Sequence, residues 1–144
     1  MTSFPADPTI WLPHRAPFLL LDAVTEVSPG VSARATWHLR GTEDFFAGHF
    51  PGHPITPGVL LLESIAQCGA VAVLDDPRYA GKLPLFGGVE KARFRKAVVP
   101  GDEVELFCEM TRLSARGGKG VGTASVNGVV CVEAELLFVV MDRP

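Results

Sequence analysis

Hydrophobic positions along the chain fall into short strand-like runs on both sides of one long apolar segment. Before that segment, runs at 18–27 and 31–39 flank Ser28-Pro29-Gly30, a turn cluster that predicts a β-hairpin. After it, four more runs favour strands, with breaks at Pro100-Gly101-Asp102 and Asn127-Gly128. Asn127-Gly128 is the strongest hairpin signal, and we interpret 116–120 as a flexible hairpin connection. The four later strands are predicted at 85–94, 103–113, 118–126 and 129–140.

The long apolar segment predicts one helix over residues 57–74. Thr56 is suited to cap it, Pro57 suits the first helical position, and Asp75-Asp76-Pro77 ends it. Apolar residues occupy nearly every side of this helix, which in a soluble protein predicts burial all round. We therefore expect a single α+β domain over residues 1–144, with an antiparallel sheet of five or six strands wrapped around one long central helix.

The composition and charge of the chain disfavour several classes of function. With 47% hydrophobic and 20% charged residues, the chain of 144 residues can close a core. A net charge of -3 with interspersed signs disfavours a nucleic-acid partner. The sequence shows neither a signal peptide nor a charge-free apolar stretch of membrane-spanning length. Three cysteines without CxxC spacing predict buried thiols in a reducing compartment; we expect a cytoplasmic protein and prefer a buried Cys68 to a nucleophile.

Two polar residues stand out among the apolar ones. Glu63 lies inside the predicted apolar helix, and Gln67 one turn later shares its face. A buried carboxyl group is costly unless it is paired, neutralised or functional. His49 precedes the helix on a loop stiffened by prolines at 51, 54 and 57. The combination predicts an acid and a base that act together.

Other interpretations of these residues are weaker. His49 and Glu63 could each make structural hydrogen bonds, and either residue alone favours that interpretation. A metal site with His53 is disfavoured, because the two histidines flank a Phe-Pro-Gly turn instead of forming a helical pair. We expect His53 to be a loop residue, and His14 and His38 to be structural or surface groups. Ser64 lacks the setting of a nucleophile elbow.

A histidine and a glutamic acid suit the removal of water from a 3-hydroxyacyl group. A neutral imidazole can take the proton next to the carbonyl, while a protonated carboxyl group delivers one to the departing hydroxyl. Apolar surroundings favour the protonated form of Glu63. Backbone N–H groups at the helix start, around Gly58, can stabilise charge on the thioester oxygen, and Gly58 has no side chain to obstruct the thioester.

Four motifs, in order, make the chain closely resemble the FabZ-type (3R)-hydroxyacyl-acyl carrier protein dehydratases of fatty-acid synthesis. The resemblance runs from about residue 10 to residue 140, and the second motif is highly specific. The motifs are Leu12-Pro-His-Arg-Ala-Pro-Phe-Leu-Leu-Leu-Asp22, Gly48-His-Phe-Pro-Gly-His-Pro-Ile-Thr-Pro-Gly-Val-Leu-Leu-Leu-Glu63-Ser-Ile-Ala-Gln67, Lys91-Ala-Arg-Phe-Arg-Lys96 and Val99-Pro-Gly-Asp102.

This resemblance implies a hotdog fold in homodimers that often assemble into hexamers. It implies that His49 is the catalytic histidine, that Glu63 is the acid from the partner subunit, and that Gly58 lies at the oxyanion site. We expect Phe50, Val59 and Gln67 to line the oxyanion and substrate-binding part of the site. The substrate would be an acyl chain on the phosphopantetheine arm of acyl carrier protein, in a tunnel at the dimer interface, with no metal or organic cofactor. Glu63, where isomerising relatives carry Asp, favours dehydration alone.

The chain departs from the family pattern at Ala16, Ala23, Leu85 and Ala97. These positions leave the acid and the base intact, but they bear on chain-length preference, tunnel gating and carrier docking, and they are compatible with a specialised, polyketide-type pathway. A basic cluster could dock the acidic carrier or simply be a solvated strand edge. Two other functions compete: a hotdog acyl thioesterase, and a non-catalytic acyl-thioester-binding or regulatory module. The basic cluster is Lys91, Arg93, Arg95 and Lys96.

Overall fold

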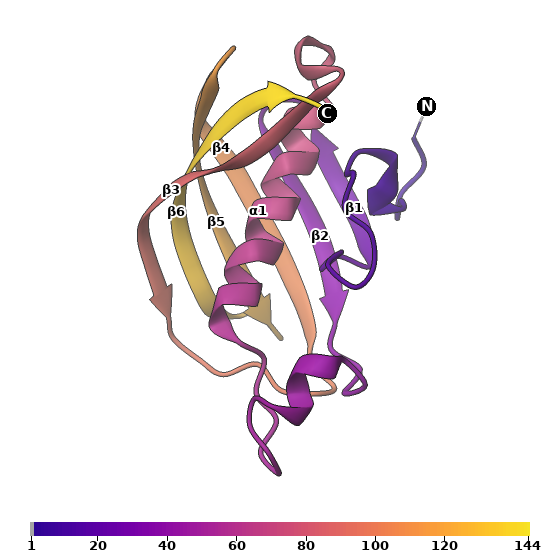
Figure 1. The fold of residues 1–144 in the computed structure, drawn as a ribbon, viewed down its shortest axis with the longest axis vertical. Helices are drawn as coiled ribbons and strands as arrows, with labels where there is room; N and C mark the ends of the chain where they lie inside the picture. Colours follow the sequence, from indigo (N-terminus) through magenta and orange to yellow (C-terminus); the bar gives the residue numbers. More distant parts are fainter. Residues whose placement is uncertain (1) are drawn as a thin grey trace.

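Residues 2–144, which the computed structural model describes, form a six-stranded antiparallel sheet and one long helix, α1 (Figure 1). The sheet curves around α1 with the strand order β1-β2-β4-β5-β6-β3. The predicted α+β architecture, with a sheet wrapped around an apolar helix, is confirmed. The strands are β1 (Ala23–Ser28), β2 (Ser32–His38), β3 (Lys82–Phe94), β4 (Glu103–Ser114), β5 (Gly117–Val126) and β6 (Val129–Asp142).

Helix α1 (Gly58–Leu74) is buried along most of its length because every strand of the sheet packs against it. Ile65, Cys68 and Val71 are completely shielded from solvent. Helix and sheet approach closely where β5 carries Gly122, since a Cβ atom there would lie 2.5 Å from Cγ2 of Ile65. Apolar residues on all sides of the helix therefore have partners, as the sequence predicts.

The start of α1 differs from the prediction. The helix begins at Gly58 with Pro57 as its N-cap, so Pro57 does not occupy the first helical position. Thr56 does not cap the helix: within residues 2–144 its buried hydroxyl has no hydrogen-bond partner. Its backbone N–H instead donates to the carbonyl of Val98 at 2.8 Å. A tertiary contact, which local sequence does not reveal, thus fixes this boundary.

The first strand is shorter than predicted. β1 begins at Ala23, not at Phe18, although 18–22 has the composition of a strand. The reason is that backbone groups of Phe18 and Leu20 bond to the side chain of Gln67 on α1. These groups are consequently unavailable to a neighbouring strand.

All three predicted hairpins are present, including the one formed by β4 and β5, although the connection between these two strands is not where we expected it. β1 and β2 pair as a hairpin, and Asn127-Gly128 turns between β5 and β6 with both residues at positive φ, 50° and 78°. The expected flexible loop at 116–120 is wrong, because β5 already begins at Gly117. Gly118 and Gly120 pair with Leu113 and Met110 of β4, so the glycines continue the ladder.

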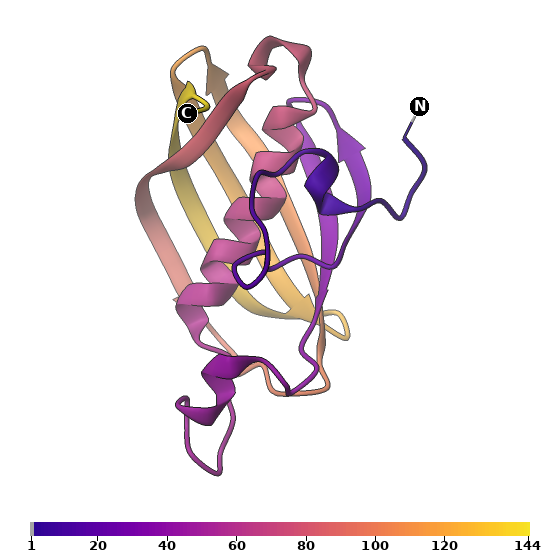
Figure 2. The same ribbon diagram turned by 45° about the vertical axis from the view of Figure 1, so that its right-hand side comes forward.

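The N-terminal segment crosses α1 before it enters the sheet (Figure 2). It contains a short 3-10 helix, η1 (Pro8–Ile10), and buries Leu12 almost completely. The indole N–H of Trp11 donates to Asp75 at the C-cap of α1 at 2.8 Å. The segment is thus attached along the helix. Two further 3-10 helices, η2 (Asp44–Ala47) and η3 (Pro77–Tyr79), flank α1 in sequence.

Candidate active site

His49 is held in one orientation on the loop that precedes α1. Its Nδ1 lies 2.7 Å from the carbonyl oxygen of Ile55, and the N–H of Ile55 donates back to the His49 carbonyl at 2.8 Å. A carbonyl oxygen only accepts, so Nδ1 must carry the proton. The ring stacks on Phe50 with 4.0 Å between centroids. A neutral imidazole held in this way presents Nε2 with a free lone pair, as a general base requires.

A cavity of about 450 Å³ lies between His49 and the start of α1. The helix leaves the N–H groups of Gly58 and Val59 without intrahelical acceptors. Gly58 also needs to be glycine, because a Cβ atom there would lie 2.6 Å from Cδ1 of Phe94. These residues thus bring two free donors to the cavity that His49 lines. Val59 and Phe50 are exposed, by 67% and 49%.

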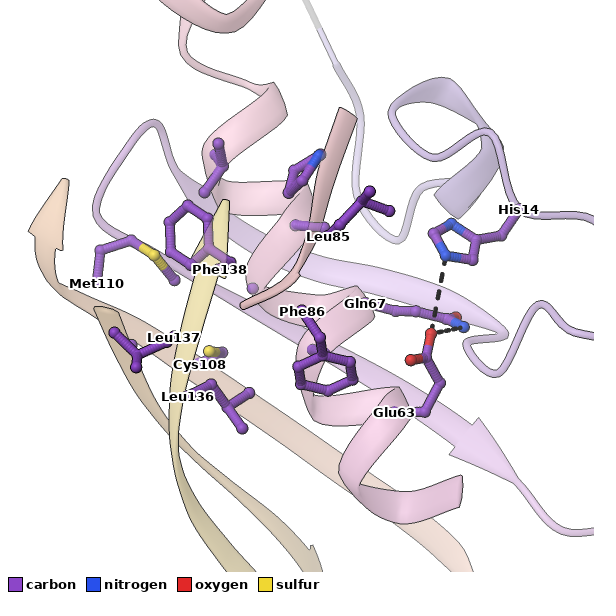
Figure 3. Close-up of a pocket in the computed structure, with 16 residues that line it drawn as sticks. His14, Glu63, Gln67, Leu85, Phe86, Cys108, Met110, Leu136, Leu137 and Phe138 are labelled. Atoms are coloured by element: carbon purple, nitrogen blue, oxygen red, sulfur yellow. Dashed lines mark hydrogen bonds and ion pairs between the residues drawn. The ribbon is translucent and has the colours of Figure 1, made fainter. Parts of the chain in front are cut away.

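Glu63 lies at the polar end of a second cavity, of about 140 Å³ (Figure 3). Its Oε2 accepts a hydrogen bond from Gln67 Nε2 at 2.9 Å and lies 3.7 Å from Nε2 of His14. The rest of the wall is almost entirely apolar or small. The lining includes Ala66, Gly69, Ala70, Val73, Pro84, Leu85, Phe86, Cys108, Met110, Gly120, Leu136, Leu137 and Phe138.

The predicted shared face of Glu63 and Gln67 is present, but Gln67 is only 1% exposed. Its Oε1 accepts from the N–H of Leu20, and its Nε2 donates to the carbonyl of Phe18, both at 2.9 Å. Gln67 lines the cavity beside Glu63, yet its amide is engaged within the chain. Gln67 thus lines the cavity with its amide bonded to Phe18, Leu20 and Glu63, and its part in substrate binding stays a prediction.

His14 is the site residue that sequence reasoning missed. We expected a structural or surface group, but its imidazole lines the cavity of Glu63 and is three-quarters buried. Arg15 shapes this turn by donating to the carbonyls of Leu12 and His14 at 2.8 and 2.7 Å. The sequence signal for His14 was its place in the motif that begins at Leu12, which contributes to the family resemblance but suggested no role for this residue.

The two central residues do not share a cavity within one chain. His49 lines the cavity at the start of α1, whereas Glu63 lines the cavity that lies farther along the helix. His53 lies on the exposed loop tip, as expected. Within residues 2–144, no three His, Cys, Asp or Glu side chains gather as ligands for a metal ion.

The cysteines are buried thiols, as predicted. Cys68 is completely buried and its Sγ lies 3.3 Å from the carbonyl of Ala33. Burial raises the pKa of Cys68 well above its ordinary value, and raises the pKa of Cys108 to about 12. Neither thiol supplies a thiolate nucleophile near neutral pH. In the described part of the chain, no helix combines the length and hydropathy needed to span a bilayer.

An antiparallel sheet wrapped around one long central helix is the hotdog fold. A solved structure described as the dehydratase heterocomplex ApeI:P from Xenorhabdus doucetiae has this fold, with a TM-score of 0.77 over 96% of this chain and 91% of that chain. The sequence identity is 22%, so this likeness concerns the fold alone.

The FabA-like domain family matches residues 12–138, and the chain belongs to this family. Two curated relatives carry the name 3-hydroxyacyl-[acyl-carrier-protein] dehydratase FabZ. The protein from Clostridium botulinum (strain Okra / Type B1) is 50% identical over 129 residues, which cover 90% of each chain. The protein from Moorella thermoacetica is 50% identical over 132 residues, which cover 92% of each chain. The resemblance found in the motifs thus extends across nearly the whole sequence.

Proposed function

We propose that this chain removes water from (3R)-hydroxyacyl thioesters on acyl carrier protein and forms trans-2-enoyl thioesters in fatty-acid biosynthesis. The named dehydratases at 50% identity support this reaction. The structural observation that carries the proposal is the hydrogen bond between His49 Nδ1 and the Ile55 carbonyl. In a neutral imidazole this bond places the hydrogen on Nδ1 and leaves Nε2 free to accept, as proton abstraction next to a thioester carbonyl requires.

In the proposed mechanism, Nε2 of His49 takes a proton from C2 of the substrate. The electron pair of that C–H bond forms the C2–C3 double bond while the hydroxyl group leaves C3. Glu63 transfers its proton to the departing hydroxyl, so water and the enoyl thioester are the products. Imidazolium and carboxylate then return to their starting forms by proton exchange with water.

The start of α1 supplies the electrostatic part of the reaction. Negative charge develops on the thioester oxygen when C2 loses its proton, and N–H groups aimed at that oxygen stabilise it. Gly58 and Val59 carry such groups beside the cavity that His49 lines. The proposed oxyanion site is therefore made of backbone, and glycine is required at residue 58 because the Phe94 ring occupies the space of a Cβ atom.

We place the complete site between two subunits, with His49 from one and Glu63 from its partner. The separate cavities of the two residues support this arrangement. β3 forms one edge of the sheet and carries exposed apolar side chains, which suit pairing with a second copy. They are Leu85, Phe86, Val89 and Phe94, with exposures between 43% and 54%. The assembly would be a homodimer, or a trimer of such dimers.

The partner in the reaction would be acyl carrier protein, whose phosphopantetheine arm delivers the acyl chain. Lys91, Arg93, Arg95 and Lys96 are exposed and suit an acidic protein surface, although Arg95 already pairs with Glu133 at 2.7 Å. Residues 1–144 would act as one catalytic domain in the cytoplasm, where the three unpaired cysteines remain reduced.

A purified 3-hydroxyacyl thioester tests the proposal against its two competitors. A dehydratase yields the enoyl thioester, which is followed by its ultraviolet absorbance. A thioesterase releases free thiol, and a binding module shows saturable binding without turnover. Either of the last two results would overturn the proposed function.

A further inference from the structure

We propose that Gln67 is a positioning residue that determines which oxygen of Glu63 carries the acidic proton. This inference rests on the proposed function, in which Glu63 is the acid, and adds the atom from which the proton leaves. The starting observation is that the Gln67 side chain is 1% exposed, so each of its polar atoms needs a partner inside the protein.

The backbone fixes the orientation of the Gln67 amide. The N–H of Leu20 can only donate, so the side-chain atom 2.9 Å from it must be the oxygen. The carbonyl of Phe18 can only accept, so the atom 2.9 Å from it must be the nitrogen. Rotating the amide by half a turn would bring two buried donors together and two acceptors together, which is strongly unfavourable.

The fixed amide in turn determines the state of Glu63. With one N–H directed at Phe18, the second N–H of Gln67 donates to Oε2 of Glu63 at 2.9 Å. That oxygen must be an acceptor. A neutral carboxyl group has one carbonyl oxygen and one hydroxyl oxygen. Because the carbonyl oxygen is the stronger acceptor of the two, Oε2 takes that role and the proton resides on Oε1.

His14 does not alter this assignment. Its Nε2 is 3.7 Å from Oε2, which is too far for a hydrogen bond that would draw a proton to that oxygen. Figure 3 shows Oε2 facing His14 and Gln67, while the other carboxyl oxygen of Glu63 is turned toward Phe86. Phe86 is part of the cavity wall, so the protonated oxygen is the one turned toward the lining of the cavity and away from His14 and Gln67.

This assignment gives a role to the first sequence motif, Leu12 to Asp22. Phe18 and Leu20 belong to it, and their backbone groups hold Gln67 in place. The N-terminal segment therefore acts on the acid across α1 without contacting the reacting atoms. This role also explains why 18–22 does not join the sheet.

The test is a double-mutant cycle between Gln67→Met and Glu63→Gln in the full-length protein. Met has nearly the length of Gln but donates no hydrogen bond. We expect Gln67→Met to lower kcat by about tenfold or more with little change in KM, because only the proton transfer is affected. In the Glu63→Gln background the same substitution should cost nothing further, since Gln67 acts only through that carboxyl group.

Several results would overturn the inference. A raised KM with unchanged kcat, or a loss that multiplies that of Glu63→Gln, would indicate direct substrate contact. If the natural chain does not dehydrate a 3-hydroxyacyl thioester, the proposed function fails. If it does and Glu63→Gln leaves the rate unchanged, Glu63 is not the acid, and both outcomes are separate from failure of the Gln67 assignment. Ser64→Ala is the matched control, because Ser64 is buried on the same helix, bonds only to the Leu61 carbonyl and should leave kcat unchanged.

A spectroscopic measurement covers the case in which Gln67→Met does not fold. It uses only the natural chain and Glu63→Gln. The carbonyl stretch of protonated Glu63, identified by its absence in Glu63→Gln, should lie at the lower frequency of a hydrogen-bonded carboxyl carbonyl, because Oε2 accepts from Gln67. A band at the frequency of a free carbonyl would contradict the assignment of the proton to Oε1.

Discussion

The indole N–H of Trp11 donates to Oδ1 of Asp75 at 2.8 Å and joins the N-terminal segment to the C-terminal end of α1. The same segment carries the backbone groups that hold Gln67. A contact at one end of the helix thus helps to maintain the surroundings of Glu63, about three turns away.

Trp11→Phe should lower the free energy of unfolding by about 1–3 kcal/mol, because it removes a hydrogen bond to a carboxylate together with some packing. Urea unfolding measures this loss. Asp75→Asn is the control, since an amide oxygen can still accept from the indole and most of the stability should remain. Equal stability of Trp11→Phe and the natural chain would show that the contact is energetically unimportant.

His49→Asn and Glu63→Gln should each leave a folded protein and reduce dehydration by about a hundredfold or more, because each removes a proton-transfer group. The initial rate with a 3-hydroxyacyl thioester gives the effect. His53→Asn changes an exposed histidine of the same loop and should retain full activity. Near-normal turnover in His49→Asn or Glu63→Gln would refute the assigned roles.

Co-expression of His49→Asn with Glu63→Gln should restore activity if the two residues meet across subunits. With random pairing, about one quarter of the sites combine an intact His49 with an intact Glu63, so about a quarter of the natural turnover should return. The control pairs His49→Asn with a chain that carries both substitutions, which offers no intact site. No recovery in the first mixture would place both residues in the same subunit.

Gly58→Ala should destabilise the protein by about 1–3 kcal/mol, because its Cβ would lie 2.6 Å from the Phe94 ring. Phe94→Ala in the same chain should remove most of that penalty. Gly48→Ala is the steric control, since a Cβ atom at Gly48 would meet nothing within 4 Å beyond its chain neighbours. Thermal unfolding compares the variants, and an undisturbed Gly58→Ala would mean that the ring moves aside freely.

Stability should fall as the pH rises above about 9. Burial raises the pKa of Cys108 from its usual 9.0 to about 12, so the unfolded chain releases this proton first and gains stability relative to the folded state. The stabilisation that Cys108 contributes is complete below pH 9.0. It is lost progressively as the pH rises from 9.0 to about 12. Urea unfolding at pH 8 and pH 10 should show a smaller decline for Cys108→Ala; an identical decline would exclude this thiol as a cause.

Local signals in the sequence predicted the parts of the fold that depend on local chemistry. Asn127-Gly128 defines its turn because both residues accept positive φ, and the continuous apolar segment identifies the central helix. The errors concern groups whose partners are distant in sequence. Thr56 bonds to Val98, and Phe18 and Leu20 bond to Gln67, so neither the helix cap nor the start of β1 could be obtained from neighbouring residues.

The residues of the candidate site divide in the same way, into those that local sequence reveals and those that depend on contacts distant in sequence. His49 and Glu63 were recognisable because a proline-stiffened loop and an apolar helix make polar groups conspicuous. The approach of His14 to Glu63 was not recognisable from the sequence, because it depends on how the N-terminal segment crosses α1. The use of the Gln67 amide by Phe18 and Leu20 is hidden for the same reason.

Small residues in the wall of the Glu63 cavity determine how much room a substrate has, and they are not the residues that carry out the reaction. A Cβ atom at Gly69 would lie 2.8 Å from Cys108 Sγ, and one at Gly120 would lie 3.0 Å from Met110 Cε. Met110 lies well away from the carboxyl group in Figure 3. A methyl group added at either position would crowd Cys108 or Met110 and narrow this part of the cavity, and the atoms that it would meet do not belong to Glu63, Gln67 or His14. The range of accepted chain lengths could therefore diverge between relatives by single substitutions while the reaction itself stays the same.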